Sequence, residues 1–222
     1  MGSMAGHGKL LWGLLLTLTL TCAAPAAFPA PKNHAEAVAG LKHSDPAERA
    51  EAVAWLAEYG RIVDQPLLLE RLRDEDEDVR TFAEQGLWLL WMRSGDPAID
   101  RALAEGTALM GAGRLPEAIA IFSEIIRRRP AFAEGWNKRA TAYFLAGDYR
   151  RSLADCEQVI KRNPRHFGAL SGYGQIYFRL EQFDKAIEYW RRALQVNPNM
   201  SGLQMNIEAA EQRLREKGAR SI

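Results

Sequence analysis

Large apolar residues recur in the second half of the chain at a spacing that fits pairs of short helices. Three prolines, Pro130, Pro164 and Pro198, stand 34 residues apart. When the windows 99–132, 133–166 and 167–200 are superposed, small residues share position 8 and bulky or soft residues share position 24. Position 8 holds Gly106, Ala140 and Gly174, and position 24 holds Phe122, Cys156 and Trp190. A fixed period of this length predicts stacked helix pairs, because one pair cannot bury its own apolar face.

The three windows resemble the tetratricopeptide repeat (TPR). The family pattern has Trp, Leu, Gly, Tyr, Ala, Phe, Ala and Pro at positions 4, 7, 8, 11, 20, 24, 27 and 32. Trp136 and the three prolines match it, whereas position 7 departs from Leu, with Glu105, Arg139 and Tyr173. The resemblance implies an all-α, right-handed superhelical α-solenoid. Residues 201–217 are expected as a C-terminal capping helix, because one face of them carries the apolar stripe Leu203, Ile207, Ala210 and Leu214.

The turn inside each helix pair is expected near window position 15. Gly113 and Gly147 stand there in the first two windows and can end a helix in a left-handed conformation. Glu181 stands there in the third window and predicts a poorer stop.

Residues 33–98 have a second period, of 31 residues. Leu41, Asp45 and Arg49 fall on Leu72, Asp76 and Arg80. These two units resemble short HEAT-like repeats of the phycobilin-lyase type, in which Asp caps the second helix of each pair. Asp45-Pro46 and Asp96-Pro97 fit a helix N-cap followed by proline in the first turn. With so short a junction, the two repeat types are expected to form one continuous solenoid.

The N-terminus predicts a signal peptide over residues 1–26. Lys9 precedes an apolar run from Leu10 to Leu20, which is shorter than the roughly 20 residues that a membrane span needs. Ala24-Pro25-Ala26 predicts cleavage after Ala26, and hence an exported, periplasmic chain. An uncleaved anchor and a lipoprotein modified at Cys22 are alternatives. Without Cys22 the chain keeps only Cys156, which is expected to be a core residue rather than a reactive thiol.

Charge is divided unevenly, although the formal net charge of the whole chain is only +1. Residues 33–98 contain 14 Asp/Glu and 7 Lys/Arg, a net of −7, and residues 99–222 contain 14 Asp/Glu and 20 Lys/Arg, a net of +6. The basic clusters fit a solvated outer face, and alternatively contact with an anionic membrane surface or an acidic partner. A nucleic-acid partner is not expected, because no RNA- or DNA-binding module is found.

Residues that could support catalysis form no recognisable set. Outside the predicted signal peptide the histidines are His34, His43 and His166, and none has a metal-ligand spacing. The acidic run Asp74–Asp78 lacks the glycine and the spacing of an EF-hand, and better fits a capped helix start. No enzyme activity, metal or cofactor is therefore predicted.

The resemblance implies that the first helix of each pair lines a concave groove, through window positions 2, 5, 9 and 12. The candidate peptide-binding residues at these positions are Leu103, Thr107, Met110, Glu134, Asn137, Thr141, Phe144, Gly168, Ser171, Gln175 and Phe178. Gly168 is expected to let a ligand backbone approach, beside an apolar row of Met110, Phe144 and Phe178. Some family members hold a C-terminal carboxylate with Lys, Asn and Arg, but this chain has Leu103, Thr107, Lys138, Gly168 and Gly172 at those positions.

The sequence therefore predicts a non-catalytic protein–protein interaction scaffold. Segments such as GWNKRAT and HFGALSGYG resemble TPR proteins of the bacterial cell envelope. The partner is expected to be an extended or helical peptide with apolar anchors. Two alternatives stay open: a regulatory or accessory subunit of an envelope enzyme, and a self-assembling scaffold that forms homo-oligomers.

Overall fold

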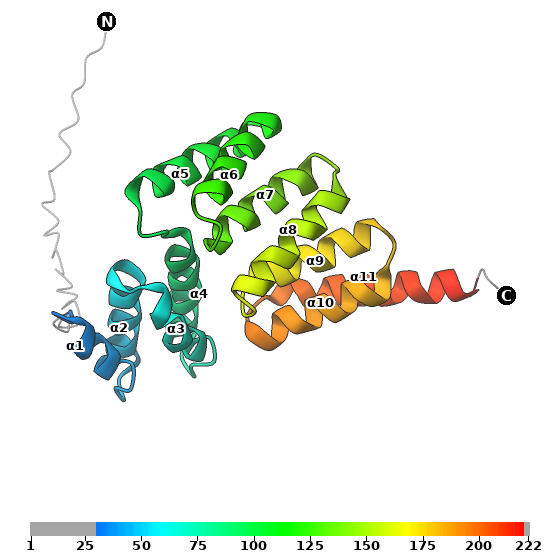
Figure 1. The fold of residues 1–222 in the computed structure, drawn as a ribbon. Coiled ribbons are helices and arrows are strands. Elements are labelled where there is room, and N and C mark those ends of the chain that lie inside the picture. Colours follow the sequence, from blue (N-terminus) through cyan, green and yellow to red (C-terminus); the bar gives the residue numbers. More distant parts are fainter. Residues whose placement is uncertain (1–29, 220–222) are drawn as a thin grey trace, which may run out of the picture.

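Helices make up the regular structure of residues 30–219, the part of the chain that the structure, a computed structural model, describes (Figure 1). The N-terminal unit contains α1 (His34–Gly40), α2 (Pro46–Tyr59), a 3-10 turn (Ile62–Asp64), α3 (Gln65–Arg71) and α4 (Glu77–Met92). The repeats contain α5 (Pro97–Gly111), α6 (Leu115–Arg128), α7 (Ala133–Leu145), α8 (Tyr149–Arg162), α9 (Phe167–Arg179) and α10 (Phe183–Val196). The last helix is α11 (Ser201–Ala219). The prediction of an all-α solenoid is confirmed.

The two helices of each repeat meet where a small residue faces a large one. A Cβ built at Gly106 would lie 2.6 Å from the ring of Phe122, and one at Gly174 would lie 2.3 Å from the indole of Trp190. In the middle repeat, where the large partner is replaced by Cys156, Ala140 takes the place of glycine. The size of one residue is therefore matched to the size of the other, which keeps the interior close-packed.

The turns inside the three repeats share a left-handed residue. Gly113 has φ +76° and Gly147 has φ +77°, as expected of glycines that end a helix. Glu181 adopts φ 55° at the same place in the third repeat. A side chain in this conformation costs about 1–2 kcal/mol, so the geometry of the turn is imposed by the packing of α9 on α10.

Arg139, which replaces the family leucine, forms a polar link between neighbouring helices. Its guanidinium makes two hydrogen bonds to the carboxylate of Asp155 on α8, at 2.7 and 2.9 Å. A third hydrogen bond, of 3.0 Å, reaches Oγ of Ser123 on α6. One side chain thus joins the second helix of the first repeat to both helices of the second.

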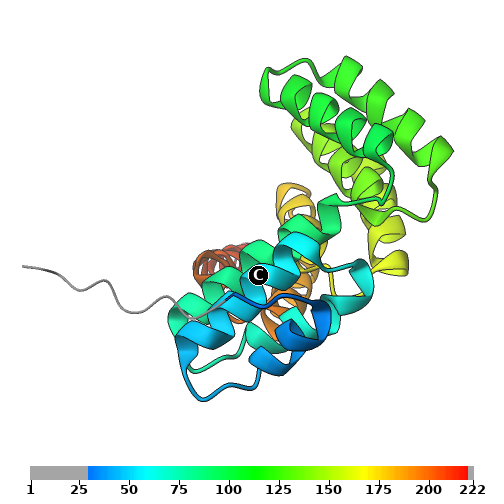
Figure 2. The same cartoon turned by 90° about the vertical axis from the view of Figure 1, so that its left-hand side faces the viewer.

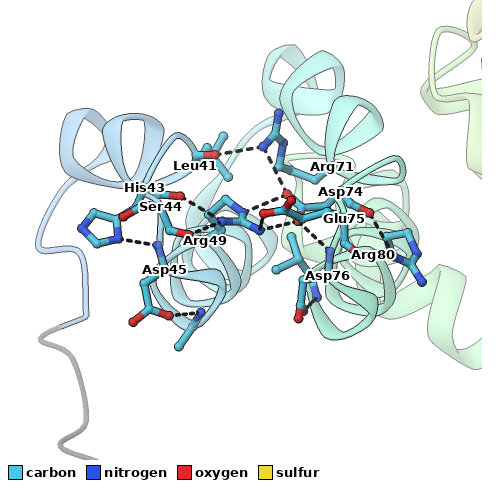
Figure 3. Close-up of polar contacts among 12 residues, drawn as sticks. Leu41, His43, Ser44, Asp45, Arg49, Arg71, Asp74, Glu75, Asp76 and Arg80 are labelled. Carbon is cyan, nitrogen blue, oxygen red and sulfur yellow. Dashed lines mark hydrogen bonds and ion pairs between the residues drawn. The ribbon is translucent and has the colours of Figure 1, made fainter.

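The 31-residue period of the N-terminal unit is reproduced in its hydrogen bonds (Figure 3). Arg49 donates to the backbone carbonyls of His43 and Ser44, six and five residues before it, at 3.0 Å each. Arg80 donates in the same way to the carbonyls six and five residues before it, those of Asp74 and Glu75, at 3.0 and 2.9 Å. The two units are therefore equivalent in geometry as well as in sequence.

A buried ion pair joins these two units. Arg49 holds the carboxylate of Asp74 through hydrogen bonds of 3.0 and 2.7 Å, and both side chains are almost completely buried (Figure 3). Burial alone would raise the pKa of Asp74, but the hydrogen bond from Arg49, the amide of Asp76 and the charges of Arg49 and Arg71 lower it below the usual range. The charged pair is therefore the stable form in the folded protein.

The junction between the unit and the repeats differs from the expected continuous stack. α4 packs mainly on α2 and α3, and the unit folds back against the ends of α9 and α10 (Figures 1 and 2). Phe167, the first residue of α9, is fully buried in the core of the N-terminal unit, and Val196 and Met200 pack against the same core. The prediction of a continuous stack is wrong because side chains of the third repeat complete the core of the N-terminal unit.

The predicted signal peptide, residues 1–26, lies outside the described residues. Among the helices of residues 30–219, none has the length and apolar character needed to cross a membrane.

Candidate functional site

A small pocket lies between α7 and α9, on the helices that were predicted to line the groove. Its volume is about 130 Å³. Its lining residues are Asn137, Ala140, Thr141 and Phe144 from α7, Ser152 and Cys156 from α8, and Gly168, Ala169, Gly172, Gln175 and Ile176 from α9. Five of the predicted groove residues, Asn137, Thr141, Phe144, Gly168 and Gln175, are therefore brought together here.

Gly172 lines the pocket and leaves open space in front of its own helix. A Cβ built on this residue would meet no heavy atom within 4 Å, apart from its own helix. The bland explanation of this glycine, close packing between neighbouring helices, is therefore not supported. Since glycine in a helix interior costs about 0.5–1 kcal/mol relative to alanine, its presence here needs another explanation.

The chemistry of the pocket favours binding over reaction. The floor is formed by Ala140, Ile176 and Cys156, and burial, followed by the charge of Asp155, raises the pKa of the Cys156 thiol to about 12. A thiol that stays protonated is a weak nucleophile. Thr141 and Gln175 are exposed at the rim and offer a hydroxyl and an amide. The pocket thus presents an apolar floor with a hydrogen-bonding rim.

Some predicted groove residues lie elsewhere. Leu103 is buried in the core between α5 and α6. Thr107 and Met110 are half-buried on α5, and Ser171 accepts a hydrogen bond from the Trp190 indole through its carbonyl, at 3.2 Å. Since Leu103 packs inward, its placement in the groove is corrected.

The expected apolar row of Met110, Phe144 and Phe178 is also corrected. Met110 packs against the core of the first repeat. Phe178 packs against Phe183 and Trp190, with ring centroids 5.4 and 5.7 Å apart. Phe144 alone of the three lines the pocket, so one aromatic ring, not a row, faces this site.

Gly168 lines the pocket on one side but serves the packing of the N-terminal unit. A Cβ built on it would lie 2.2 Å from Cη2 of Trp88 on α4. The hypothesis that this glycine makes room for a ligand is wrong, because the indole of the chain itself fills the space.

Glu134, another predicted groove residue, is completely buried with His166. Nδ1 of His166 accepts the backbone N–H of Ala169, so Nε2 carries the proton that faces Oε2 of Glu134 at 3.1 Å. Burial raises the pKa of Glu134, but the hydrogen bond from His166, with Lys138 and Asn137, outweighs it and holds the pKa below the usual range. The placement of Glu134 in the groove is therefore corrected, because its carboxylate faces inward.

The contact between the N-terminal unit and the repeats, here called the seam, contains residues that the sequence did not indicate. The indole of Trp91 stacks on His166 with ring centroids 4.0 Å apart and donates to Oε1 of Gln65 at 2.6 Å. Gln65 and Asn163 exchange two amide hydrogen bonds, of 3.2 and 2.9 Å. The helical spacing of Trp88 and Trp91 could have shown a shared buried face, but not the partner that covers it.

Two further contacts continue the seam to the third repeat. Arg73 donates to the backbone carbonyls of Gln195 and Val196, and Asn199 donates to the carbonyl of Leu72 at 2.8 Å. The N-terminal unit is thus held through its second helix pair, α3 and α4, which contacts the second and third repeats.

No group of three or more His, Cys, Asp or Glu side chains within residues 30–219 is placed to hold a metal ion.

Comparison with known proteins shows what the repeats are similar to. The family model described as tetratricopeptide repeat matches residues 103–149 and 137–201. Residues 103–201, somewhat less than half of the chain, are thus similar to tetratricopeptide repeats. A TPR repeat-containing protein of Rhizobium etli is 34% identical over 126 residues, which are 57% of this chain and 62% of that protein. Hsp70-Hsp90 organizing protein 1 of Glycine max is 31% identical over 105 residues, which are 47% of this chain and 18% of that protein.

Solved TPR structures show the same fold. The first TPR of Spaghetti (RPAP3), bound to the HSP90 peptide SRMEEVD, superposes with a TM-score of 0.51 at 22% identity. The match covers 53% of this chain and 93% of that structure. This chain therefore spans a whole TPR domain of that kind, but less than two thirds of the curated relatives' own lengths.

Proposed function

We propose that this chain is a non-catalytic protein–protein interaction adaptor that binds a peptide segment in the pocket between α7 and α9. The observation that carries the proposal is Gly172, a helix-interior glycine with open space in front of it. A volume of about 130 Å³ admits one apolar side chain as an anchor. The exposed Thr141 and Gln175 can hydrogen-bond the peptide backbone beside it.

The relatives support the class of function and not a particular partner. TPR domains among the structural neighbours are found with peptides of chaperones, as in the complex with SRMEEVD. The positions that hold a carboxylate in such family members carry Leu103, Thr107 and Lys138 here, with Gly168 and Gly172. The proposed peptide is therefore recognised by an apolar anchor rather than by its terminal carboxylate.

The test is a selection of short random peptides against the purified chain, followed by affinity measurements on variants. Gly172→Leu fills the pocket while gaining helix propensity, so it is expected to fold as the wild type and to lose peptide binding. Gly202→Leu is the matched control, since Gly202 also has open space and lies on α11, outside the pocket. Wild-type affinity in a folded Gly172→Leu variant would overturn the proposal.

We also propose that the chain is exported to the bacterial periplasm, after removal of residues 1–26, and that the N-terminal unit is a HEAT-like pair. Lys9, the short apolar run and Ala24-Pro25-Ala26 support export. The matched hydrogen bonds of Arg49 and Arg80 support the repeat. N-terminal sequencing of envelope material is expected to begin near Ala27, and an intact Met1 would contradict export with cleavage.

A further inference from the structure

A second hollow lies between the N-terminal unit and the first two repeats. Its volume is about 440 Å³. Its lining residues are Ile62, Gln65, Trp91, Arg93, Ser94, Arg128, Arg129, Pro130, Ala131, Phe132, Ala133, Arg162, Asn163 and Pro164. This hollow, here called the arginine cleft, contains four arginines and no acidic residue in its lining. It shares no residue with the pocket between α7 and α9.

The arginines of the cleft are oriented without being neutralised. Arg129 donates to the carbonyl of Ser94 at 2.7 Å, and Arg162 donates to the carbonyls of Pro130 and Gln158 at 2.5 and 2.8 Å. Arg93 donates to carbonyls at the C-terminal end of α2, among them that of Glu58 at 2.7 Å. Carbonyl oxygens hold a guanidinium in place but carry no full charge, so its positive charge persists.

The remaining arginine, Arg128, makes no salt bridge within 4.0 Å to a described residue. Two acids feel its charge: Glu124, which pairs with Arg127, and Asp96, which caps α5 by accepting the N–H of Ala98 at 2.9 Å. This hydrogen bond, and then the charges of Arg128 and Arg129, lower the pKa of Asp96. Two carboxylates outside the lining, those of Asp96 and Glu124, therefore face the charges of these arginines, while the lining itself contains four guanidinium groups.

The start of α7 adds to the positive potential. Ala131, Phe132 and Ala133 form one wall of the cleft, and α7 begins at Ala133. Phe132, the N-cap residue, offers no side-chain hydrogen bond to the first turn. The N-terminal end of a helix carries a partial positive charge and unpaired N–H groups, both of which favour an anion.

We propose that the arginine cleft binds an acidic peptide segment of a protein partner, one that carries at least two carboxylates. Guanidinium groups match the planar carboxylate with paired hydrogen bonds. Ile62, Pro130 and Phe132 offer apolar contacts for the methylene groups and backbone of the peptide. A recess between two helical units suits a narrow chain better than the flat surface of a lipid bilayer.

The test measures binding of a fluorescein-labelled oligoglutamate peptide by fluorescence anisotropy. Arg128→Gln is expected to weaken binding about tenfold, the loss typical of one hydrogen bond to a charged group. Because Arg128 has no hydrogen-bond partner among the described residues, this variant is expected to fold, which circular dichroism checks. Arg127→Gln is the matched control: it removes the same charge one residue away, but Arg127 pairs with Glu124 at 2.6 Å and does not line the cleft.

The outcomes distinguish peptide binding in the arginine cleft from binding by overall charge, from binding of a membrane or free phosphate, and from peptide binding in the pocket between α7 and α9. Equal losses of peptide affinity in Arg127→Gln and Arg128→Gln would overturn the proposal, because binding would then depend on the overall charge of the protein and not on the cleft. The proposal would also be overturned if phosphatidylglycerol vesicles bound in an Arg128-dependent way while the peptide did not bind. Complete displacement of the peptide by dilute inorganic phosphate would overturn it as well. Gly172→Leu is expected to leave oligoglutamate binding unchanged, so the two proposals can fail separately.

Discussion

At the scale of single residues, each repeat depends on one matched pair of side-chain sizes. Gly106 accommodates Phe122, Ala140 accommodates Cys156, and Gly174 accommodates Trp190. The windows of the sequence showed the two positions, but not that the sizes compensate within each repeat. That relation appears only when the two helices are in contact, because it depends on which atoms face each other.

Gly174→Ala is expected to destabilise the protein by about 1–3 kcal/mol, the range for overpacking a core. The added methyl would lie 2.3 Å from the indole of Trp190, which is buried and donates a hydrogen bond to the carbonyl of Ser171. Urea unfolding measures the change. Gly172→Ala, on the same helix, is the control and is expected to raise stability slightly; equal effects of both variants would contradict the packing account.

At the scale of elements, the period of the repeats was predictable and the position of the N-terminal unit was not. Apolar spacing identifies the buried face of each helix, so the helix pairs and α11 could be expected from the sequence. The same spacing says nothing about the element that covers a face. Phe167 was expected to begin the first helix of the third repeat, and it does, but its ring packs against Trp88 and Trp91 of α4 in the core of the N-terminal unit.

The prediction at this scale concerns Phe167→Ala. Truncation of a buried phenylalanine typically costs about 3–5 kcal/mol, and here the cavity lies in the core shared with α4. Amide hydrogen exchange is expected to accelerate most in α3, α4 and the start of α9. Phe122→Ala, an equally buried ring in the first repeat, is the control and is expected to act most on α5 and α6. Identical exchange patterns for the two variants would contradict the shared core.

At the scale of the whole molecule, the seam joins an acidic unit to basic repeats. It also determines which part of α9 a partner can reach. Trp88 covers Gly168 at one end of the concave surface, while Gly172 and Gln175 stay accessible further along α9. Four of the predicted groove residues, the pocket residues Asn137, Thr141, Phe144 and Gln175, could be found from the repeat register. The register could not exclude Leu103, Glu134 and Gly168 from the groove. The burial of Leu103 and Glu134, and the packing of the N-terminal unit on Gly168, depend on tertiary contacts.

The buried pair of Glu134 and His166 predicts a loss of stability in acid. The pKa of Glu134 is lower in the folded than in the unfolded chain, so its ionised form contributes stability above the unfolded pKa of about 4.3. This contribution is lost as the pH falls through the lower folded value. Urea unfolding from pH 7 to pH 3 is expected to show a shallower decline in Glu134→Gln than in the wild type. Parallel declines would contradict an ionised Glu134 in the folded protein.

The pocket between α7 and α9 is tested most directly as a binding site by mapping a selected peptide onto the folded chain by NMR. Titration of the peptide into the ¹⁵N-labelled protein is expected to shift the amide signals of Asn137, Thr141, Gly172 and Gln175, which line the pocket between α7 and α9. The signals of Asn137, Thr141 and Gln175 should stay in place when the peptide is added to Gly172→Leu. Shifts confined to the outer helices α6 and α8, or to the arginine cleft, with those four signals unmoved, would contradict the pocket as the binding site.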